Sequence, residues 1–393
     1  MKPWRVIVLL ALLTGCGVQK DGGDSYAGRR IVMGDERMSE YLPALEGQRV
    51  AILTNHTGLA GTKKNSPHIL DVLLNKQVNV ALVFSPEHGF RGTADAGEKV
   101  ESGRDPKTGV RVVSLYGSKT QPSAEDFDIL LVDIQDVGTR FYTYYIAVLR
   151  MMEVCAANNK KVIILDRPNP NGFMVDGPLL DMKYKSGVGA LPIPVVHGMT
   201  LGELARMAVG EGWTAPVDLT VVPCLNYNHA TLYRLPIAPS PNLRDMQAVY
   251  LYPSTCLFEG TTLSLGRGTR WPFEVYGHPN FPRKGFSFTP SSVKGAKNPP
   301  LKDRKCYGVD LRRKSQKSIR ANGLDLSYLI DAYQKMDAPA DFWRRDGFFE
   351  LLIGVDYVRE MIDNGATAEE IKARWAPDVE KFKTQRTKYL IYE

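Results

Sequence analysis

The sequence predicts an α/β protein with a Rossmann-like, doubly wound, mostly parallel sheet, followed by a second, smaller α+β domain. Short, almost continuously apolar runs recur along the first half, and each ends in a polar cluster. Such runs are typical of parallel strands that are buried on both faces. Segments with helical spacing of apolar residues lie between them, and this alternation indicates a doubly wound fold.

Five runs are expected to be strands because they are short and rich in β-branched residues. They are residues 49–53, 78–84, 129–132, 162–165 and 219–222.

Three segments are expected to be helices because apolar residues recur at spacings of three and four. They are residues 66–75, 139–157 and 200–211. The last begins with Thr200 and Glu203 at the spacing of a capping box.

Length and composition limit the class of protein. The chain has 393 residues, of which 44% are hydrophobic and 24% charged, which excludes a disordered, collagenous or coiled-coil protein. Five cysteines are too few for a disulfide scaffold. A net charge of +7 is too small for a dedicated nucleic-acid binder, so no nucleic-acid partner is predicted, and no protein partner is evident.

The cysteines after residue 16 lie far apart, and no C-x-x-C pair suggests a zinc knuckle. We expect buried free thiols at Cys155 and Cys224, whereas the sequence leaves any pairing of Cys155, Cys224, Cys256 and Cys306 open.

The first 16 residues resemble a lipoprotein signal peptide. Lys2 and Arg5 flank the short apolar run 6–13, which is too short to span a bilayer as a permanent helix. The run ends in LTGC, a lipobox whose Cys16 would be acylated and anchor the protein to a membrane of the cell envelope. The alternative is an ordinary signal peptide with an incidental Cys16. Residues 17–28 are polar and Gly-rich, as in a tether.

The Pro-rich passage 235–241 is the expected domain junction, between an N-terminal domain at residues 29–236 and a C-terminal domain at residues 237–393. The second domain contains a basic segment, residues 283–320, with 12 Lys or Arg against two acidic residues. A solvated face is the favoured interpretation, with binding to anionic cell-wall polymers or membrane as the alternative.

Ligands of open parallel sheets bind beyond the carboxyl ends of the strands. The polar clusters follow those ends, so we expect them to converge on one edge. Their members are His56, Glu87, His88, Asp133, Gln135, Asp136, Asp166 and Asn169. No G-x-G-x-x-G, phosphate-binding G-x-x-x-x-G-K-[ST] or G-x-S-x-G motif is present, so no cofactor is predicted.

Glu87 is the strongest candidate for a general acid. Pro86 stiffens the backbone before it, and Gly89 permits a sharp turn after it. Partial shielding by Phe84 and Phe90 would raise the pKa of its carboxyl group. The alternative is that Glu87 caps the next segment or pairs with Arg91.

The cluster 133–140 offers further polar groups. Asp133 and Asp136 can orient water or sugar hydroxyls, and Gln135 can both donate and accept hydrogen bonds. Arg140 can bind a carboxylate in bidentate fashion. Alternatively, Asp136 or Thr139 caps the following helix.

Histidines could line the same cleft. His197 precedes the Thr200 cap, and a satisfied structural histidine is equally consistent with that position. His56, His88 and His197 could join Asp133 in a metal site, but no short-range ligand pair supports this, and no metal is predicted.

A third cluster, residues 258–274, is rich in Gly, Thr and Arg. Arg267 or Arg270 can recognise an anionic group, and Trp271 and Phe273 can pack on the apolar face of a sugar. The alternative is a structural loop that packs the two domains together.

These clusters resemble the DUF1343 family, also described as NamZ-type exo-β-N-acetylmuramidases. The resemblance extends from about Gly34 to Glu393. Its motifs are residues 54–58 (TNHTG), 85–92 (SPEHGFRG), 133–144 (DIQDVGTRFYTY), 166–170 (DRPNP), 259–261 (EGT) and 266–269 (GRGT).

The resemblance implies an enzyme that removes N-acetylmuramic acid (MurNAc) from the non-reducing end of peptidoglycan fragments. The minimal substrate would be MurNAc-β-1,4-GlcNAc, and the active site would lie in a cleft between a Rossmann-like domain and a smaller C-terminal domain. The family's proposed catalytic glutamate corresponds to Glu87. The second catalytic group, which would act beside this glutamate, is not fixed by the resemblance. The candidates are Asp133, Asp136, Glu98, Glu259 and the acetamido group of the substrate.

An arginine would recognise the lactyl carboxylate of MurNAc, and Arg140, Arg267 and Arg270 are the candidates. The predicted substrate-binding residues are Asn55, His56, His88, Gln135, Arg140, Tyr142, Asp166, Asn169, His197, Glu259, Thr261, Arg267 and Thr269.

Two other classes of protein are also consistent with the sequence. A non-catalytic sugar-binding lipoprotein would pass muropeptides to a transporter and would not need a poised acid at Glu87. A metal-dependent amidase or deacetylase of the same wall material would lose its activity in a strong chelator.

Overall fold

The computed structural model describes residues 28–86, 90, 102–115, 123–336 and 339–393. In this part of the chain a seven-stranded sheet has the order β3-β4-β2-β1-β5-β6-β9. Neighbouring strands are parallel except at the edge pair β3 and β4. The strands are β1 (Val50–Thr54), β2 (Val80–Ser85), β3 (Gly103–Arg104), β4 (Arg111–Ser114), β5 (Ile129–Asp133), β6 (Lys161–Leu165) and β9 (Leu219–Val222).

The six parallel strands have the strand order of a Rossmann fold, because their order along the chain reads 3-2-1-4-5-6 across the sheet. The order reverses between β1 and β5, where ligand crevices form in such sheets. The predicted fold class is therefore confirmed, as are the five predicted strands. The sequence did not reveal β3 and β4, which are short strands at the sheet edge.

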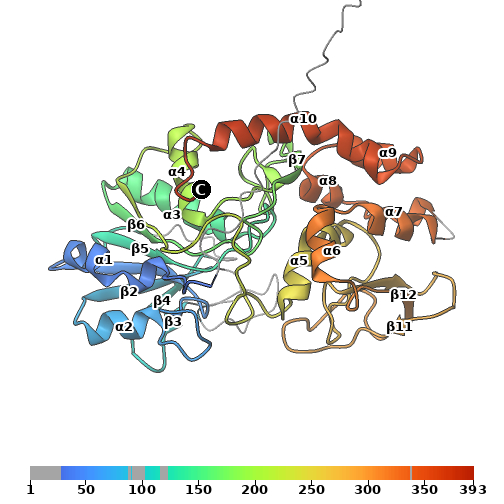
Figure 1. The fold of residues 1–393 in the computed structure, drawn as a ribbon. Coiled ribbons are helices and arrows are strands. Elements are labelled where there is room, and N and C mark those ends of the chain that lie inside the picture. Colours follow the sequence, from blue (N-terminus) through green and yellow to red (C-terminus); the bar gives the residue numbers. More distant parts are fainter. Residues whose placement is uncertain (1–27, 87–89, 91–101, 116–122, 337–338) are drawn as a thin grey trace, which may run out of the picture.

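Alternation along the strands divides the core into two layers. In β1, Ala51 and Leu53 face one layer, while Val50 and Ile52 face the other. The helices α3 (Tyr144–Ala157) and α4 (Leu201–Gly210) cover the first layer. The helices α1 (Met38–Leu45) and α2 (Ile69–Asn75) cover the second layer (Figure 1).

The three predicted helices are present, and two begin later than expected. The capping box of α4 is confirmed, since Thr200 accepts from the Glu203 backbone and Glu203 reaches back. The helix α3 begins at Tyr144 instead of residue 139. Residues 139 and 140 instead pair with the hairpin of β7 (Asp176–Leu179) and β8 (Pro194–Val196), so neither Asp136 nor Thr139 caps the helix.

The second domain combines a small antiparallel sheet with helices. Its sheet has the order β10 (Val275–His278), β12 (Cys306–Asp310) and β11 (Ser287–Phe288). Its helices are α5 (Met246–Thr255), α6 (Gln316–Asn322), α7 (Ser327–Gln334), α8 (Phe348–Ile353), α9 (Tyr357–Asp363) and α10 (Ala368–Arg386). Short 3-10 helices complete the described chain at Gly34–Glu36 (η1), Met182–Tyr184 (η2), Cys256–Gly260 (η3) and Pro339–Asp341 (η4).

The chain returns to the first domain at its end. Figure 1 shows α10 running from the second domain across to the first, where the C-terminus lies. The Tyr392 hydroxyl donates to Asp166 at 2.7 Å, and the backbone of Ile391 donates to Glu203 at 2.8 Å. Both carboxylates are buried in the first domain. The C-terminal segment therefore fastens the two domains together.

A buried arginine also joins the domains. The Arg140 guanidinium donates to the carbonyls of Pro178 and Ile193 in the first domain, at 2.9 and 2.7 Å. It also donates to the carbonyls of Leu352 and Ile353 in α8, at 3.0 and 2.7 Å. Arg140 is fully buried. The bidentate carboxylate-binding role predicted for this residue therefore does not fit, because its hydrogen bonds go to main-chain oxygens.

The four cysteines of the described chain are free thiols and are buried, as expected for Cys155 and Cys224. Within the described residues, no helix combines the length and apolar character needed to cross a membrane.

Replacing Arg140 by Met should lower the free energy of unfolding by at least about 3 kcal/mol, because four buried carbonyls lose their donors. Chemical denaturation measures the change. The matched control is Arg313→Met, at an exposed position, which should change stability by less than about 0.5 kcal/mol. Equal stability of the two variants would contradict the role assigned to Arg140.

Candidate active site

The carboxyl ends of β1 and β5 meet at the reversal of the sheet order. Thr54 at the end of β1 lies opposite Asp133 at the end of β5. The Gln135 backbone N–H donates to the Thr57 hydroxyl at 3.0 Å, and that hydroxyl donates to the Asn55 side chain at 2.6 Å. The structure thus brings the clusters 54–58 and 133–136 together, as the sequence predicted.

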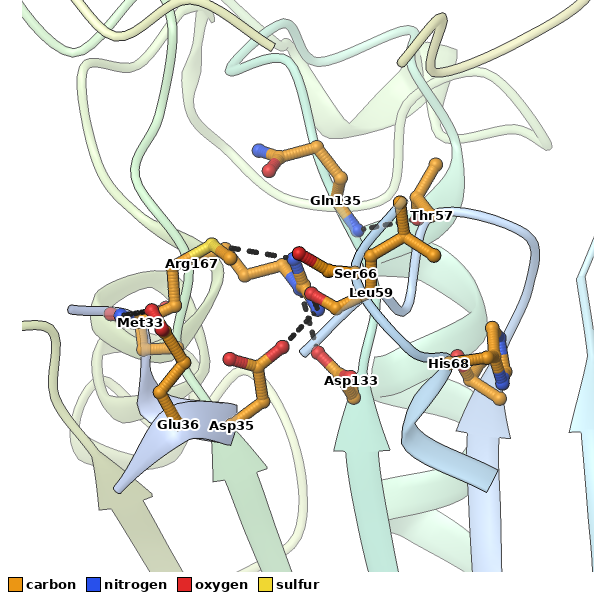
Figure 2. Close-up of polar contacts among 12 residues, drawn as sticks. Met33, Asp35, Glu36, Thr57, Leu59, Ser66, His68, Asp133, Gln135 and Arg167 are labelled. Carbon is orange, nitrogen blue, oxygen red and sulfur yellow. Dashed lines mark hydrogen bonds and ion pairs between the residues drawn. The ribbon is translucent and has the colours of Figure 1, made fainter. Parts of the chain in front are cut away.

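Arg167 lies between two buried carboxylates at this edge (Figure 2). Its Nε donates to Asp133 and its Nη2 donates to Asp35, both at 2.6 Å. All three side chains are at most 3% exposed. Burial raises the pKa of Asp35, and the Arg167 charge opposes this effect. The ion pair fixes the position of Asp133, so Asp133 supports the edge of the sheet.

Gln135 and Asp136 continue the edge. The Gln135 amide donates to the carbonyls of Asp136 and Pro168, both at 2.8 Å. The Asp136 carboxylate accepts from the Gly138 backbone at 2.7 Å. Burial raises the pKa of Asp136 to about 7, although hydrogen bonds from the backbone of Gly138 and Val137 lower it.

Five side-chain atoms at this edge are buried without a partner among the described residues: Asp35 Oδ1, Asn55 Nδ2, Asp133 Oδ2, Gln135 Oε1 and Asp136 Oδ2. Buried polar atoms are seldom left unpaired in native proteins, and each exception calls for an explanation such as a catalytic role or an ordered water. Their clustering at the β1–β5 junction makes this edge a candidate for ligand or water binding.

Three other predicted residues belong to the interior of the first domain. Asp166 accepts hydrogen bonds from Thr200, Tyr392 and the Gly202 backbone. The Asn169 amide donates to the Met199 carbonyl at 2.9 Å. His197 accepts from the Met199 backbone, and burial lowers its pKa to about 3. These buried side chains hold the loops behind the edge and do not line the cavity described next.

A cavity of about 820 Å³ lies between the two domains. Its first-domain wall comes from residues 141–144 and 187–188, and its second-domain wall comes mainly from η3, residues 261–273 and residues 295–300. The Pro-rich passage 235–241 connects it to the strand ends. His56 Nε2 lies 2.9 Å from the Ala238 carbonyl, and the Tyr142 hydroxyl donates to the Pro239 carbonyl at 2.9 Å.

Aromatic side chains form much of the cavity wall. Tyr252 contacts Phe141, Tyr142 and Phe273 edge to face, with ring centroids 5.3, 6.1 and 4.9 Å apart. Phe273 has φ of 66°, a left-handed conformation that is rare for a bulky residue. Strained backbone of this kind tends to occur at functional sites. The other aromatic lining residues are Tyr144, Phe258 and Phe348.

An ion pair adds charge to this wall. Arg267 Nη2 lies 2.6 Å from Glu259 Oε1, and the Arg267 guanidinium lies over the Phe273 ring. Burial lowers the pKa of Arg267, but the Glu259 carboxylate outweighs burial and raises it above the ordinary value. Glu259 is the one carboxylate residue among the described residues that line the cavity. Arg344 and Lys297 also line it.

The structure sorts the remaining predicted residues into two groups. Tyr142, Glu259, Thr261 and Arg267 line the cavity, as does Phe273. Thr269, Arg270 and Trp271 do not: the Thr269 hydroxyl donates to the Gly266 carbonyl, Arg270 is exposed, and Trp271 stacks with Arg312. Glu87, His88 and Glu98 lie outside the described residues.

Several residues of the site were missed. Asp35 precedes the first strand and carried no motif, and Arg344 lies far along the chain in a region without a recognised pattern. Tyr144 belonged to the motif 133–144 and to the apolar face of a predicted helix, but was not singled out as a site residue. Tyr252 lies in a helix that is buried on all sides, so its spacing gave no signal for the cavity.

The described residues contain no group of three or more His, Cys, Asp or Glu side chains that could hold a metal ion. His56 contacts the Ala238 carbonyl, whereas His197 lies in the interior behind the edge.

The fold and the cavity define the class of protein. The molecule is a two-domain α/β protein whose aromatic, charged cavity lies beside the carboxyl edge of a Rossmann-like sheet, and the cavity's volume is typical of small-ligand sites.

Comparisons with known proteins then identify the family. Residues 50–247 match the model for "Exo-beta-N-acetylmuramidase NamZ, N-terminal", and residues 250–392 match the corresponding C-terminal model. The chain therefore belongs to the NamZ family of exo-β-N-acetylmuramidases, which are glycoside hydrolases. It is 38% identical over 384 residues to "Peptidoglycan beta-N-acetylmuramidase NamZ" of Bacillus subtilis (strain 168), covering 91% of this chain and 90% of the relative.

Two crystal structures of DUF1343 family proteins from Bacteroides fragilis are similar to the whole fold. One is 55% identical with a TM-score of 0.85, covering 92% of this chain and 99% of the other. The second is 28% identical with a TM-score of 0.74, covering 93% and 99%. The sequence resemblance to this family is thus confirmed.

The raised pKa of Asp136 predicts a dependence of stability on pH. An unfolded Asp releases its proton near pH 4, whereas the folded carboxyl keeps it until about pH 7, so this group makes folding less favourable as pH rises through that window. Asp136→Asn should flatten the dependence of the free energy of unfolding on pH. Relative to wild type, the variant should gain of the order of 2–4 kcal/mol more in this free energy at pH 8 than at pH 4. Urea unfolding across this range measures it. Asp126→Asn, at an exposed position, should parallel the wild type, and parallel profiles for both variants would contradict the assignment.

Proposed function

We propose that the protein hydrolyses the glycosidic bond of a terminal MurNAc residue at the non-reducing end of peptidoglycan fragments, with MurNAc-β-1,4-GlcNAc as the minimal substrate. Family membership and the printed activity of the Bacillus subtilis relative support this proposal. The observation that carries it is the interdomain cavity, whose walls combine aromatic rings with the Glu259–Arg267 ion pair. Rings pack on the apolar faces of sugars, and a guanidinium binds the carboxylate that distinguishes MurNAc from a neutral sugar.

Glu87 is the proposed general acid. In the sequence it comes two residues after Ser85, the last residue of β2, and β2 lies next to β1 in the sheet. Its described neighbours Ser85 and Phe90 are buried. A carboxylic acid here would protonate the glycosidic oxygen of the leaving sugar while the MurNAc ring develops oxocarbenium character. The leaving sugar departs with that proton, and water supplies the new hydroxyl of MurNAc.

Glu259 is the described carboxylate best placed to act as the second group, because it lines the cavity. In that position it would stabilise the developing positive charge or orient water, and the acetamido group of the substrate is the other source of such help. Asp133 and Asp136 were the other candidates. Their contacts with Arg167 and the Gly138 backbone support a positioning role at the strand ends.

Arg267 is the proposed partner of the lactyl carboxylate. Of the three arginines that the sequence offered, it alone lines the cavity. Its guanidinium is held by Glu259 and by the Phe273 ring, so it needs little reorganisation on binding.

Replacing Glu87 by Gln should lower kcat/KM for MurNAc-GlcNAc by a factor of about 100 or more, because an amide cannot protonate the leaving oxygen. A 4-nitrophenyl MurNAc β-glycoside should be affected much less, since its leaving group needs little protonation. Released MurNAc and nitrophenol are the readouts. Glu46→Gln, at an exposed position, is the matched control and should behave as wild type on both substrates.

Equal losses on the two substrates would argue against an acid at position 87 and for a structural role. A folded wild type that binds MurNAc in calorimetry but cleaves neither substrate would overturn the hydrolase proposal. The protein would then be a sugar-binding lipoprotein, the alternative that the sequence left open.

We also propose that acylated Cys16 attaches the protein to a membrane of the cell envelope; the supporting residues 1–27 lie outside the described structure. Cells fed a labelled fatty acid should incorporate it into the wild type, and Cys16→Ser should abolish incorporation and move the protein to the soluble fraction. The substitution removes the thiol to which the acyl group would be attached. Unchanged fractionation of Cys16→Ser would contradict the anchor.

A further inference from the structure

A second hollow lies in the C-terminal domain directly beside the interdomain cavity. Its volume is about 640 Å³, and it shares Thr262 and Arg344 with the cavity wall. Its other lining residues are His278, Asn280, Arg304, Met336, Asp341, Trp343, Arg345 and Asp346. We call it the side pocket.

A thin wall separates the side pocket from the cavity. The Thr262 backbone donates to the Phe342 carbonyl at 2.9 Å, and the Arg344 backbone donates to the Gly260 carbonyl at 3.0 Å. The Arg344 side chain also donates to the Glu259 carbonyl at 3.2 Å. Because Glu259 and Arg344 both line the cavity, the side pocket begins where the charged part of the cavity ends.

The side pocket has an excess of positive charge. Among the described residues that line it are three arginines and two aspartates. Arg344 pairs with Asp346, whereas Arg345 is 94% exposed and lies 4.0 Å from Asp341. Within the described residues no carboxylate lies within ion-pairing distance of Arg304. Arg304 and Arg345 are therefore available to an anion from solution.

The wider surroundings reinforce this charge. Residues 283–320, which include Arg304, carry a net charge of +10, whereas the entire chain carries +7. Lys297 of the same segment lines the cavity. A substrate that leaves the cavity on this side thus enters a field that favours carboxylates.

We propose that the side pocket is a second subsite, which binds a carboxylate carried by the substrate beyond the terminal sugar. This rests on the proposed function. In a peptide-free glycan of alternating sugars, every MurNAc residue carries a carboxylate, so a longer fragment presents a second anion beyond the scissile bond. A peptide attached to that internal MurNAc presents carboxylates of the same chemistry in place of the lactyl one. Arg304 and Arg345 would bind either through charge-assisted hydrogen bonds, whereas the bare disaccharide would not reach them.

The test compares substrates of increasing length on the full enzyme. Wild type should show a higher kcat/KM for the peptide-free tetrasaccharide MurNAc-GlcNAc-MurNAc-GlcNAc than for MurNAc-GlcNAc. The double variant Arg304→Gln, Arg345→Gln should lose about 10-fold of that preference and leave the disaccharide unchanged. The control is Arg313→Gln, Lys317→Gln, which removes two exposed cations of the same segment outside the side pocket. A tetrasaccharide amidated at its internal lactyl group should lose the preference in wild type too.

A third substrate, the tetrasaccharide with a peptide on its internal lactyl group, identifies the source of the carboxylate, because the lactyl carboxylate of its terminal MurNAc stays free for Arg267. A loss confined to this substrate in the double variant would assign the side pocket to the peptide. Identical length and peptide preferences in wild type and double variant would overturn the subsite. If no substrate is cleaved, the proposed function fails. The subsite is then tested by calorimetry, as the ratio of the affinities for the tetrasaccharide and the disaccharide in wild type and in the double variant.

Discussion

The buried guanidinium of Arg140 is the constraint on which the active-site geometry depends. Its hydrogen bonds reach carbonyls of both domains, and one acceptor, Leu352, itself lines the cavity. The residues that follow Arg140, Phe141 and Tyr142, form the opposite wall. A cavity between two domains keeps its shape only if the domains keep their separation. Arg140 and the C-terminal segment around Tyr392 supply that restraint from two sides.

The arginines of this protein have different roles, which depend on how deeply each one is buried and on its hydrogen-bond partners. Arg140 meets only main-chain oxygens and is structural, while Arg167 lies between two carboxylates and orders the sheet edge. Arg267 has one carboxylate partner and one face toward the cavity, so it can exchange contacts with a ligand. Arg304 and Arg345 are exposed beside the cavity and are suited to a longer substrate.

The parallel sheet and the gathering of polar residues at its carboxyl edge could be predicted because apolar runs and their polar ends are local features of the sequence. Local spacing also gave the α4 capping box. The role of Arg140 could not be predicted, because its acceptors Pro178 and Leu352 come from distant segments that only the folded chain brings together. The late start of α3 has the same cause, since the pairing with β8 overrides the helical spacing. The role of Asp35 could not be predicted for a similar reason, because nothing near it in the chain indicates its contact with Arg167.

The proposed function requires the interdomain cavity to hold the terminal MurNAc with its lactyl group on Arg267 and its glycosidic oxygen at residue 87. A crystal structure of Glu87→Gln soaked with MurNAc-GlcNAc tests it most directly. We expect the MurNAc ring against Phe273 and Tyr252, the lactyl carboxylate within hydrogen-bonding distance of the Arg267 guanidinium, and the amide introduced at position 87 beside the bridging oxygen. A disaccharide bound elsewhere, or bound in the cavity with its lactyl group turned away from Arg267, would contradict it.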